Sequence, residues 1–406
     1  MYLKKGKAAL LMAGCVGLLA LLFLAAPALR SQSLREIKLG NPLEGRKVFE
    51  KKGCGHCHSV WGARGTLGPN LAKVASGKTL MQLTGLFWSH SPKMLTVMQQ
   101  RGIASPSFTP EEMSGLMAYL QYLNYFDEPG SAVEGEKTFS QKGCNKCHSL
   151  GKTGGTVGPP LNKYASVMSP VTIAQAMWNH GLKMSSLMES HNVARPNIRN
   201  REMANLLAYI RSAAADMKPD RMYMAPGEPA KGKALFSAKG CIRCHSIRGS
   251  GGKVAPDLAK GPADQSVTEI ASAMWNHGPQ MWEKMRSMGI AVAQFSGNEM
   301  ADLIAYLYSS RRADSPGDIA KGKTLFTTKG CVQCHGAAGT IGPDLSRSAA
   351  LVSPMHLGAA MWNHASTMEK IVAEQGIAWP KFGGDEMRDL VQYVLSLRKS
   401  PAQGAQ

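Results

Sequence analysis

Four copies of one short motif divide this 406-residue chain at nearly regular intervals. Each copy reads Gly-Cys-x-x-Cys-His, and the spacings between successive copies are 90, 97 and 90 residues. The surrounding phrases recur in the same order: Gly-x-x-x-Phe before the motif, Pro-x-Leu after it, then Trp-x-His-x-x-x-Met, and last an apolar segment that carries a tyrosine. A repeat of this length predicts four tandem domains, because each copy is long enough to form a compact unit.

Segments rich in proline, glycine and aspartate mark the boundaries between the copies. The boundaries predict four domains and a tail, at residues 36–128, 129–219, 220–313, 314–398 and 399–406. Apolar residues recur at helical spacing, for example over 111–123, 299–307 and 386–397, and no segment alternates with a sustained period of two. The predicted fold is therefore all-α. The linker at 218–228 is the longest, which suggests that it separates two pairs of domains.

Residues 1–35 form a targeting segment. Three lysines precede an uncharged run from Ala8 to Leu29, whose 22 residues are enough to span a bilayer. The basic start keeps the N-terminus in the cytoplasm. We expect an uncleaved hydrophobic helix; the alternatives are a signal peptide cleaved near residues 26–28 and lipidation at Cys15. All three place residues 36–406 on the periplasmic side of the inner membrane, anchored by residues 8–29 or soluble after cleavage.

The formal net charge of +19 predicts attraction to an acidic protein or to an anionic lipid surface. Nucleic acid is the other common partner of a basic chain. We exclude it because no long block of lysine and arginine is present, and because the targeting segment directs the chain away from nucleic acid.

The Cys-x-x-Cys-His motif is the attachment signature of c-type haem. The two thiols bind the porphyrin vinyl groups, and the adjacent imidazole binds iron. A zinc site needs cysteine pairs close together in space and does not explain the repeated histidine, whereas a redox disulfide normally occurs once. We therefore predict four covalent haem c groups. The thioether residues are Cys54, Cys57, Cys144, Cys147, Cys241, Cys244, Cys331 and Cys334, and the proximal iron ligands are His58, His148, His245 and His335.

Each domain resembles a class I cytochrome c domain in its early Gly/Phe helix, its Cys-x-x-Cys-His motif, its Gly-Pro-x-Leu loop and its last helix with a tyrosine. The resemblance implies that the first and last helices cross where Gly45 meets Tyr119, and likewise in the other domains. It also implies that the loop proline accepts a hydrogen bond from the proximal imidazole, which fixes the tautomer. These prolines are Pro69, Pro159, Pro256 and Pro343. The third loop has Ala255 in place of glycine and is expected to differ.

The resemblance does not supply the sixth iron ligand. The family usually offers a methionine in a Met-Pro-x-Phe phrase, but Ser105, Arg195, Val292 and Trp379 stand at that position here. We favour instead Met94, Met184, Met281 and Met368 as distal ligands. The alternative set lies four residues earlier and comprises His90, His180, His277 and His364. Methionine ligation raises the reduction potential and a second histidine lowers it.

Two further methionine sets are weaker candidates. Met113, Met203, Met300 and Met387 are interpreted as apolar core of the last helix. The other set comprises Met98, Met188 and Met285. In the fourth domain Val372 stands at this position, so the set cannot supply a ligand to every haem. Pro92 and Pro279 are expected in the first turn of a new helix that presents Met94 and Met98 one turn apart. The repeated tryptophans are expected to pack against haem or in the core.

These features predict a tetrahaem cytochrome that carries electrons between redox proteins, with an acidic partner docked on its basic surface. The alternative is a haem enzyme, such as a peroxidase or an oxyanion reductase, with one open iron site. Every domain repeats the same candidate ligands, which favours electron transfer. A fixed redox subunit of a membrane respiratory complex is compatible with the first interpretation. His56, His191 and His356 occur once each and are interpreted as surface residues.

Overall fold

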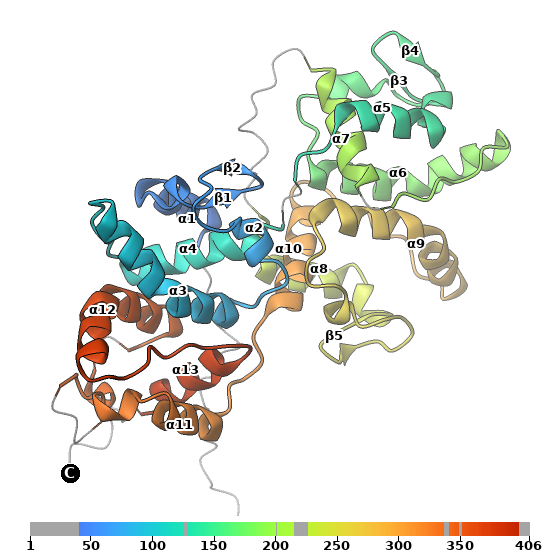
Figure 1. The fold of residues 1–406 in the computed structure, drawn as a ribbon. Helices are drawn as coiled ribbons and strands as arrows, with labels where there is room; N and C mark the ends of the chain where they lie inside the picture. Colours follow the sequence, from blue (N-terminus) through green and yellow to red (C-terminus); the bar gives the residue numbers. More distant parts are fainter. Residues whose placement is uncertain are drawn as a thin grey trace, which may run out of the picture.

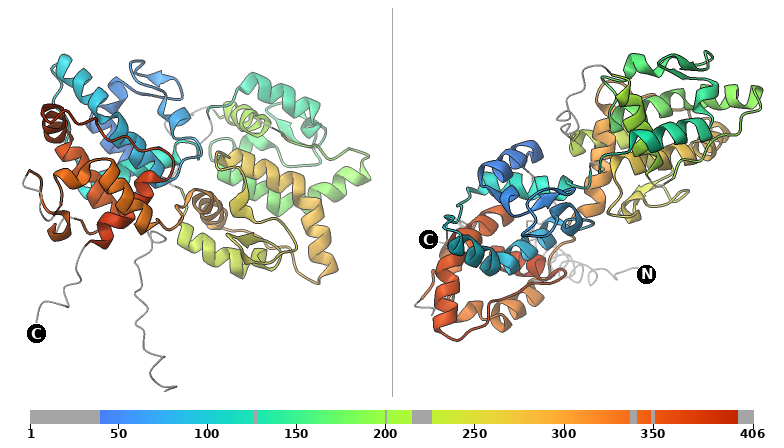
Figure 2. Two further views of the ribbon diagram at one scale, coloured as in Figure 1. Left: turned by 60° about the horizontal axis from the view of Figure 1, so that its bottom comes forward. Right: turned by 45° about the horizontal axis from the view of Figure 1, so that its top comes forward.

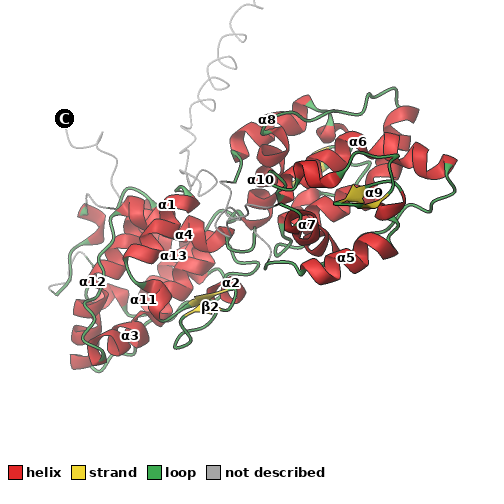
Figure 3. Ribbon diagram, turned by 90° about the horizontal axis from the view of Figure 1, so that it is seen from above, coloured by secondary structure: helices red, strands yellow, loops and turns green. Residues whose placement is uncertain are grey.

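The computed structural model describes residues 40–125, 128–199, 201–214, 226–336, 341–348 and 351–397. The predicted anchor at residues 8–29 and the tail at 399–406 lie outside these ranges. Within them, no helix is both long enough and apolar enough to cross a membrane. The described chain is mostly helical, as predicted, with a few very short strands (Figure 3).

The four repeats fold into helical units, which we number 1 to 4 in chain order. Each unit begins with a helix of ten residues and ends with one of 11–14 residues. The first helices are α1 (Pro42–Lys51), α5 (Ala132–Gln141), α8 (Pro229–Ala238) and α11 (Ile319–Thr328). The last helices are α4 (Pro110–Tyr122), α7 (Glu202–Ser212), α10 (Glu299–Arg312) and α13 (Glu386–Ser396).

Short elements connect the motif to the rest of each unit. The motif itself forms the 3-10 helices η2 (Cys54–His56), η3 (Cys144–Lys146), η6 (Cys241–Arg243) and η8 (Cys331–Gln333). Antiparallel hairpins of two-residue strands follow it in units 1 to 3: β1 (Ser59–Val60) with β2 (Ala63–Arg64), β3 (Ser149–Leu150) with β4 (Thr153–Gly154), and β5 (Ser246–Ile247) with β6 (Ser250–Gly251). Then come α2 (Leu71–Val74), η4 (Leu161–Tyr164), η7 (Leu258–Lys260) and η9 (Leu345–Arg347).

The first and last helices of each unit cross at a glycine, as the family resemblance implied. At Gly45 a Cβ atom would overlap the carbonyl of Gly115 and approach the Cβ of Tyr119. The same overlap occurs at Gly135, Gly232 and Gly322 in the other units. One turn further along each first helix, a phenylalanine ring packs on the tyrosine of the last helix. The ring centroids of Phe49 and Tyr119 are 5.5 Å apart, and the other three pairs are similar.

A helix of 21 residues carries the Trp-x-His-x-x-x-Met phrase in every unit. These helices are α3 (Leu80–Gln100), α6 (Pro170–Ser190), α9 (Val267–Ser287) and α12 (Pro354–Glu374). The prediction that Pro92 and Pro279 start a new helix is wrong, because both lie inside a continuous helix. A mid-helix proline removes one backbone hydrogen bond. These long helices pack against a neighbouring unit, and that packing compensates for the lost bond.

The units pack in pairs that differ from the order in the chain. One core contains buried residues of units 1 and 4, and a second contains those of units 2 and 3 together with Tyr122 and Tyr125. Figures 1 and 2 show the same two lobes, one blue and red, the other green and yellow. The suggestion that the longest linker separates pairs of consecutive domains is therefore wrong. Complementary surfaces on the long helices, and not closeness in sequence, select the partner.

Each pair is held by the tryptophan of the repeated phrase. Its indole N–H donates to a backbone carbonyl in the partner unit, at the loop that replaces the Met-Pro-x-Phe phrase. Trp88 donates to Pro380, Trp362 to Pro106, Trp178 to Ala293 and Trp275 to Pro196, with N···O distances of 2.9, 2.6, 2.8 and 2.8 Å. The following residue adds a second bond to the same loop: the Asn363 side chain, for example, binds both the N–H and the carbonyl of Phe108.

The two lobes meet where the last helices of units 1 and 3 come together. The hydroxyl of Tyr308 donates to the carbonyl of Gln121 at 2.9 Å, and the Tyr308 ring stacks on Tyr122 with centroids 5.2 Å apart. The backbone N–H of Val267 donates to the carbonyl of Tyr125 at 3.1 Å. Units 1 and 3 are thus the central units of the assembly.

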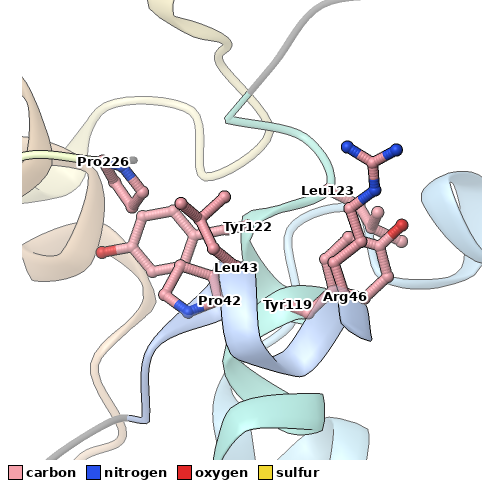
Figure 4. Close-up of a pocket in the computed structure, with 7 residues that line it drawn as sticks. All are labelled: Pro42, Leu43, Arg46, Tyr119, Tyr122, Leu123 and Pro226. Carbon is pink, nitrogen blue, oxygen red and sulfur yellow. The ribbon is translucent and has the colours of Figure 1, made fainter. Parts of the chain in front are cut away.

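A small depression lies beside this junction. It offers only ≈ 10 Å³, no more than the roughly 10–15 Å³ that a cavity needs to hold one water, and it is therefore too small for a ligand. Figure 4 shows its lining: Pro42, Leu43, Arg46, Tyr119, Tyr122, Leu123 and Pro226.

Candidate haem-attachment sites

Each motif begins with a glycine in the left-handed conformation. Gly53 has φ of 75°, and the glycines before the other three motifs have φ of 73–81°. Glycine adopts this conformation without the Cβ clash of other residues, so the chain can leave the first helix and turn directly into the motif. All eight motif cysteines are half-buried and none forms a disulfide. Burial raises the pKa of the first thiol of each pair to about 11.

The proximal histidines are held in one orientation by the loop proline. In unit 1, the imidazole Nδ1 of His58 lies 3.2 Å from the carbonyl oxygen of Pro69. The distances for His148–Pro159, His245–Pro256 and His335–Pro343 are 3.0, 2.9 and 3.2 Å. If Nδ1 carries the proton and donates it to the carbonyl, Nε2 is left with a free lone pair, which is the state that an iron ligand requires.

The glycine before this proline lies against the imidazole ring. A Cβ at Gly68, Gly158 or Gly342 would overlap the proximal histidine of its unit. Unit 3 has Ala255 there, and the sequence predicted a different loop. The hydrogen bonds are nevertheless alike: the N–H of Ala255 donates to the Cys244 carbonyl at 3.0 Å, and Gly68 donates to Cys57 at 2.8 Å. The difference is confined to the methyl group beside the His245 ring.

A lysine two residues before the first cysteine joins the motif to the far side of its unit. The Lys52 ammonium donates to the carbonyl of Ser107 at 2.7 Å and pairs with Glu112 at 3.0 Å. Lys142, Lys239 and Lys329 make the same two contacts in the other units. Sequence reasoning missed this contact, although the repeated Lys-Gly-Cys phrase was a signal for it.

The favoured methionines and the alternative histidines share one helix but differ in exposure. Met94, Met184, Met281 and Met368 are half-buried. Of the histidines, His90 is half-buried, whereas His180, His277 and His364 are exposed. His364 also hydrogen-bonds through Nδ1 to the Ala360 carbonyl of its own helix, at 2.8 Å.

His90 is the exception within its set. Burial, with smaller contributions from His58 and Lys93, lowers the pKa of His90. His90 is also the one member of its set that is half-buried, and it therefore remains an alternative ligand for unit 1.

Of the two other methionine sets, one lies inside the cores and the other shares the core edge with Met94 and Met184. Met113, Met203, Met300 and Met387 are at most 1% exposed and lie in the two cores, where the sequence placed them. Met98 and Met188 pack at the edge of these cores, one turn beyond Met94 and Met184.

The residues that replace the family's loop methionine take part in the docking of the units. The Trp379 ring stacks on Trp88, with centroids 4.3 Å apart. The Arg195 guanidinium lies 3.5 Å from the centroid of the Trp275 ring and donates to the Trp275 carbonyl at 2.9 Å. Burial there lowers the pKa of Arg195 to about 10. Each lobe thus combines one bulky residue at this position with a small one, Ser105 or Val292.

The unpaired histidines have ordinary environments. His56 and His191 are exposed, and His191 hydrogen-bonds within its own segment, to Ser190 and to the Leu187 carbonyl. His356 is half-buried and bonds through Nδ1 to Ser353, which caps α12, at 2.8 Å. No group of three or more His, Cys, Asp or Glu side chains that could hold a bare metal ion occurs in the described ranges.

Fold and site together define a chain of repeated helical redox units, each built around one Cys-x-x-Cys-His turn. The family model described as cytochrome c matches residues 43–124, 132–214, 229–311 and 319–398, and each match lies inside one predicted domain. The chain therefore belongs to the cytochrome c family; it is a multihaem class I c-type cytochrome, an electron-transfer protein with several covalently bound haem c groups. No curated protein matches the chain.

Proposed function

We propose that this chain is a tetrahaem cytochrome that passes electrons between redox proteins on the outer side of the inner membrane. The observation that supports four haems is the uniform geometry of the four sites. Each has two thiols free of disulfide bonds beside an imidazole that a proline carbonyl orients. This donor set fits haem c, since the thiols can form thioethers and Nε2 can bind iron.

The roles of the residues follow from these contacts. The eight cysteines attach the four groups, and His58, His148, His245 and His335 hold the iron. When bound, each haem supplies a one-electron redox centre. The proline carbonyls keep the imidazoles in one tautomer, and the Lys–Glu contacts hold the motif against the last helix. The four sites are built alike, which favours a relay over a single catalytic centre.

We further propose that Met94, Met184, Met281 and Met368 complete six-coordinate iron. These side chains are half-buried in every unit, whereas three of the four alternative histidines are exposed. A methionine thioether is a known axial ligand of haem iron, and half-burial shields it more from water than the exposed histidines are shielded. The location rests on the N-terminal segment, whose basic start and apolar run support an anchor or a signal peptide.

The number of haems is tested by the mass of the mature protein. We expect four added haem masses in the purified chain and three in the variant Cys144→Ala/Cys147→Ala. The control is Cys15→Ala, which should retain all four. A mature chain without added haem would overturn the proposed function.

The distal ligands are tested with carbon monoxide, which binds reduced haem only where the sixth position is open. Met94→Ala should allow one equivalent to bind, and the weak absorption band at the red end of the oxidised spectrum should lose about a quarter of its intensity if all four irons carry methionine. The matched variant is His90→Ala on the same helix, which should bind none. The reverse result would assign His90 as the ligand.

A further inference from the structure

The units are connected in space in the order 2–3–1–4. Units 2 and 3 share one core, units 1 and 4 share the other, and units 1 and 3 meet at the stacked rings of Tyr122 and Tyr308. Units 2 and 4 consequently lie at opposite ends of the described assembly, as Figures 1 and 2 show in green and red. In a relay of this shape, the terminal units are those best placed to meet partners.

The surface around the motif of unit 2 is basic. The segment 144–165 contains Lys146, Lys152 and Lys163 and no acidic residue. All three lysines are exposed, and Lys146 lies between the two motif cysteines. Two large apolar side chains of the same segment are also exposed, Val157 by 46% and Tyr164 by 45%. A polar, charged surface around a few apolar contacts is typical of a transient protein interface.

The corresponding surface of unit 4 has a different character. The segment 331–352 has one acidic and one basic residue, Asp344 and Arg347, which pair with each other at 3.5 Å. Its exposed large apolar side chains, among the described residues, are Val332 (43%), Ile341 (49%) and Val352 (46%). The motif itself carries Val332 and Gln333 where unit 2 has Asn145 and Lys146. The two ends therefore present unlike surfaces.

We propose that unit 2 is the docking end for an acidic redox protein, selected by its terminal position in space together with its basic surface and not by the order of units in the chain. The proposal rests on the electron-transfer function proposed above. Three exposed lysines without a neighbouring carboxylate in the segment attract an anionic partner over a distance of about a Debye length. Val157 and Tyr164 then provide apolar contact next to the attachment site.

Unit 3 offers a matched control, because its motif segment 241–262, with four cations and Asp257, has the same net charge as the unit 2 segment, but the unit is central. Arg243 occupies the position of Lys146, and Lys253 is exposed in the loop that follows. The test compares Lys146→Glu/Lys152→Glu with Arg243→Glu/Lys253→Glu, which change the net charge by the same amount. The probe is reduced flavodoxin, a small acidic flavoprotein, and stopped-flow absorbance measures the bimolecular rate of haem reduction at several salt concentrations.

We expect the unit 2 variant to lose about tenfold in rate at low salt and much of its salt dependence, whereas the unit 3 variant changes less than twofold. Equal losses would mean that only net charge matters and would overturn the proposal, as would no loss in either variant. Reduction by a small neutral flavin radical, which does not need the docking surface, distinguishes failure of this proposal from failure of the proposed electron-transfer function. Both variants should react with it like the original protein, and a chain that accepts no electrons from it is not an electron carrier.

Discussion

Replacing Trp362 with alanine is expected to lower the free energy of unfolding of the lobe formed by units 1 and 4 by about 3–5 kcal/mol. The Trp362 side chain is only 5% exposed, and its ring stacks on Phe87 with centroids 4.5 Å apart. The indole N–H also donates to Pro106 in the partner unit. Truncation removes this packing and leaves a partly buried carbonyl without its donor, which adds to the cost.

The matched variant is Trp275→Ala, because Trp275 makes the equivalent hydrogen bond in the other lobe, to the carbonyl of Pro196. Denaturant unfolding followed by circular dichroism should then resolve the two lobes. Trp362→Ala should move the transition of units 1 and 4 to lower denaturant, and Trp275→Ala should move that of units 2 and 3. If both variants shifted the same transition, the pairing of the units would be wrong.

The helices and their crossings could be predicted because the signals are local. The spacing of apolar residues over 111–123, 299–307 and 386–397 corresponds closely to α4, α10 and α13. The contact of Gly45 with Tyr119 followed from the family resemblance and is confirmed. These features depend only on residues within one repeat, so the sequence of a single repeat is enough to predict the helices and their crossing.

The pairing of the units could not be predicted in the same way. It depends on the fit between Trp362 and a loop 256 residues away in the chain, and the repeat gives every unit the same tryptophan and a similar loop. Arg195 and Trp379 differ from the residues at the same position in the partner units. The sequence showed only that they replace the methionine that binds iron in the family, and not that they pack against a partner unit. Arg195 packs on Trp275 and Trp379 packs on Trp88, so in units 2 and 4 this loop helps to join two units.

Replacing Gly322 with valine is expected to prevent unit 4 from folding normally. The new Cβ would overlap the Asp389 carbonyl and approach the Cβ of Tyr393. Both obstacles belong to the main chain or to its first side-chain atom, so no rotamer change relieves them and α11 must separate from α13. Overpacking costs typically about 1–3 kcal/mol and in some cases more, which is a substantial part of the stability of about 5–15 kcal/mol typical of a small domain.

The control for Gly322→Val is Lys323→Val, which places the same β-branched residue at the next, exposed position of α11. Lys323→Val lowers helix propensity and Gly322→Val raises it, so propensity does not account for a loss of stability in Gly322→Val. Only Gly322→Val obstructs the crossing. The measurement is resistance to protease, followed by peptide mass mapping, together with the number of haems per chain. Gly322→Val should expose unit 4 to cleavage and yield chains with fewer haems, while Lys323→Val should resemble the original protein. Equal behaviour of the two variants would show that the close contact of α11 with α13 does not hold unit 4 together.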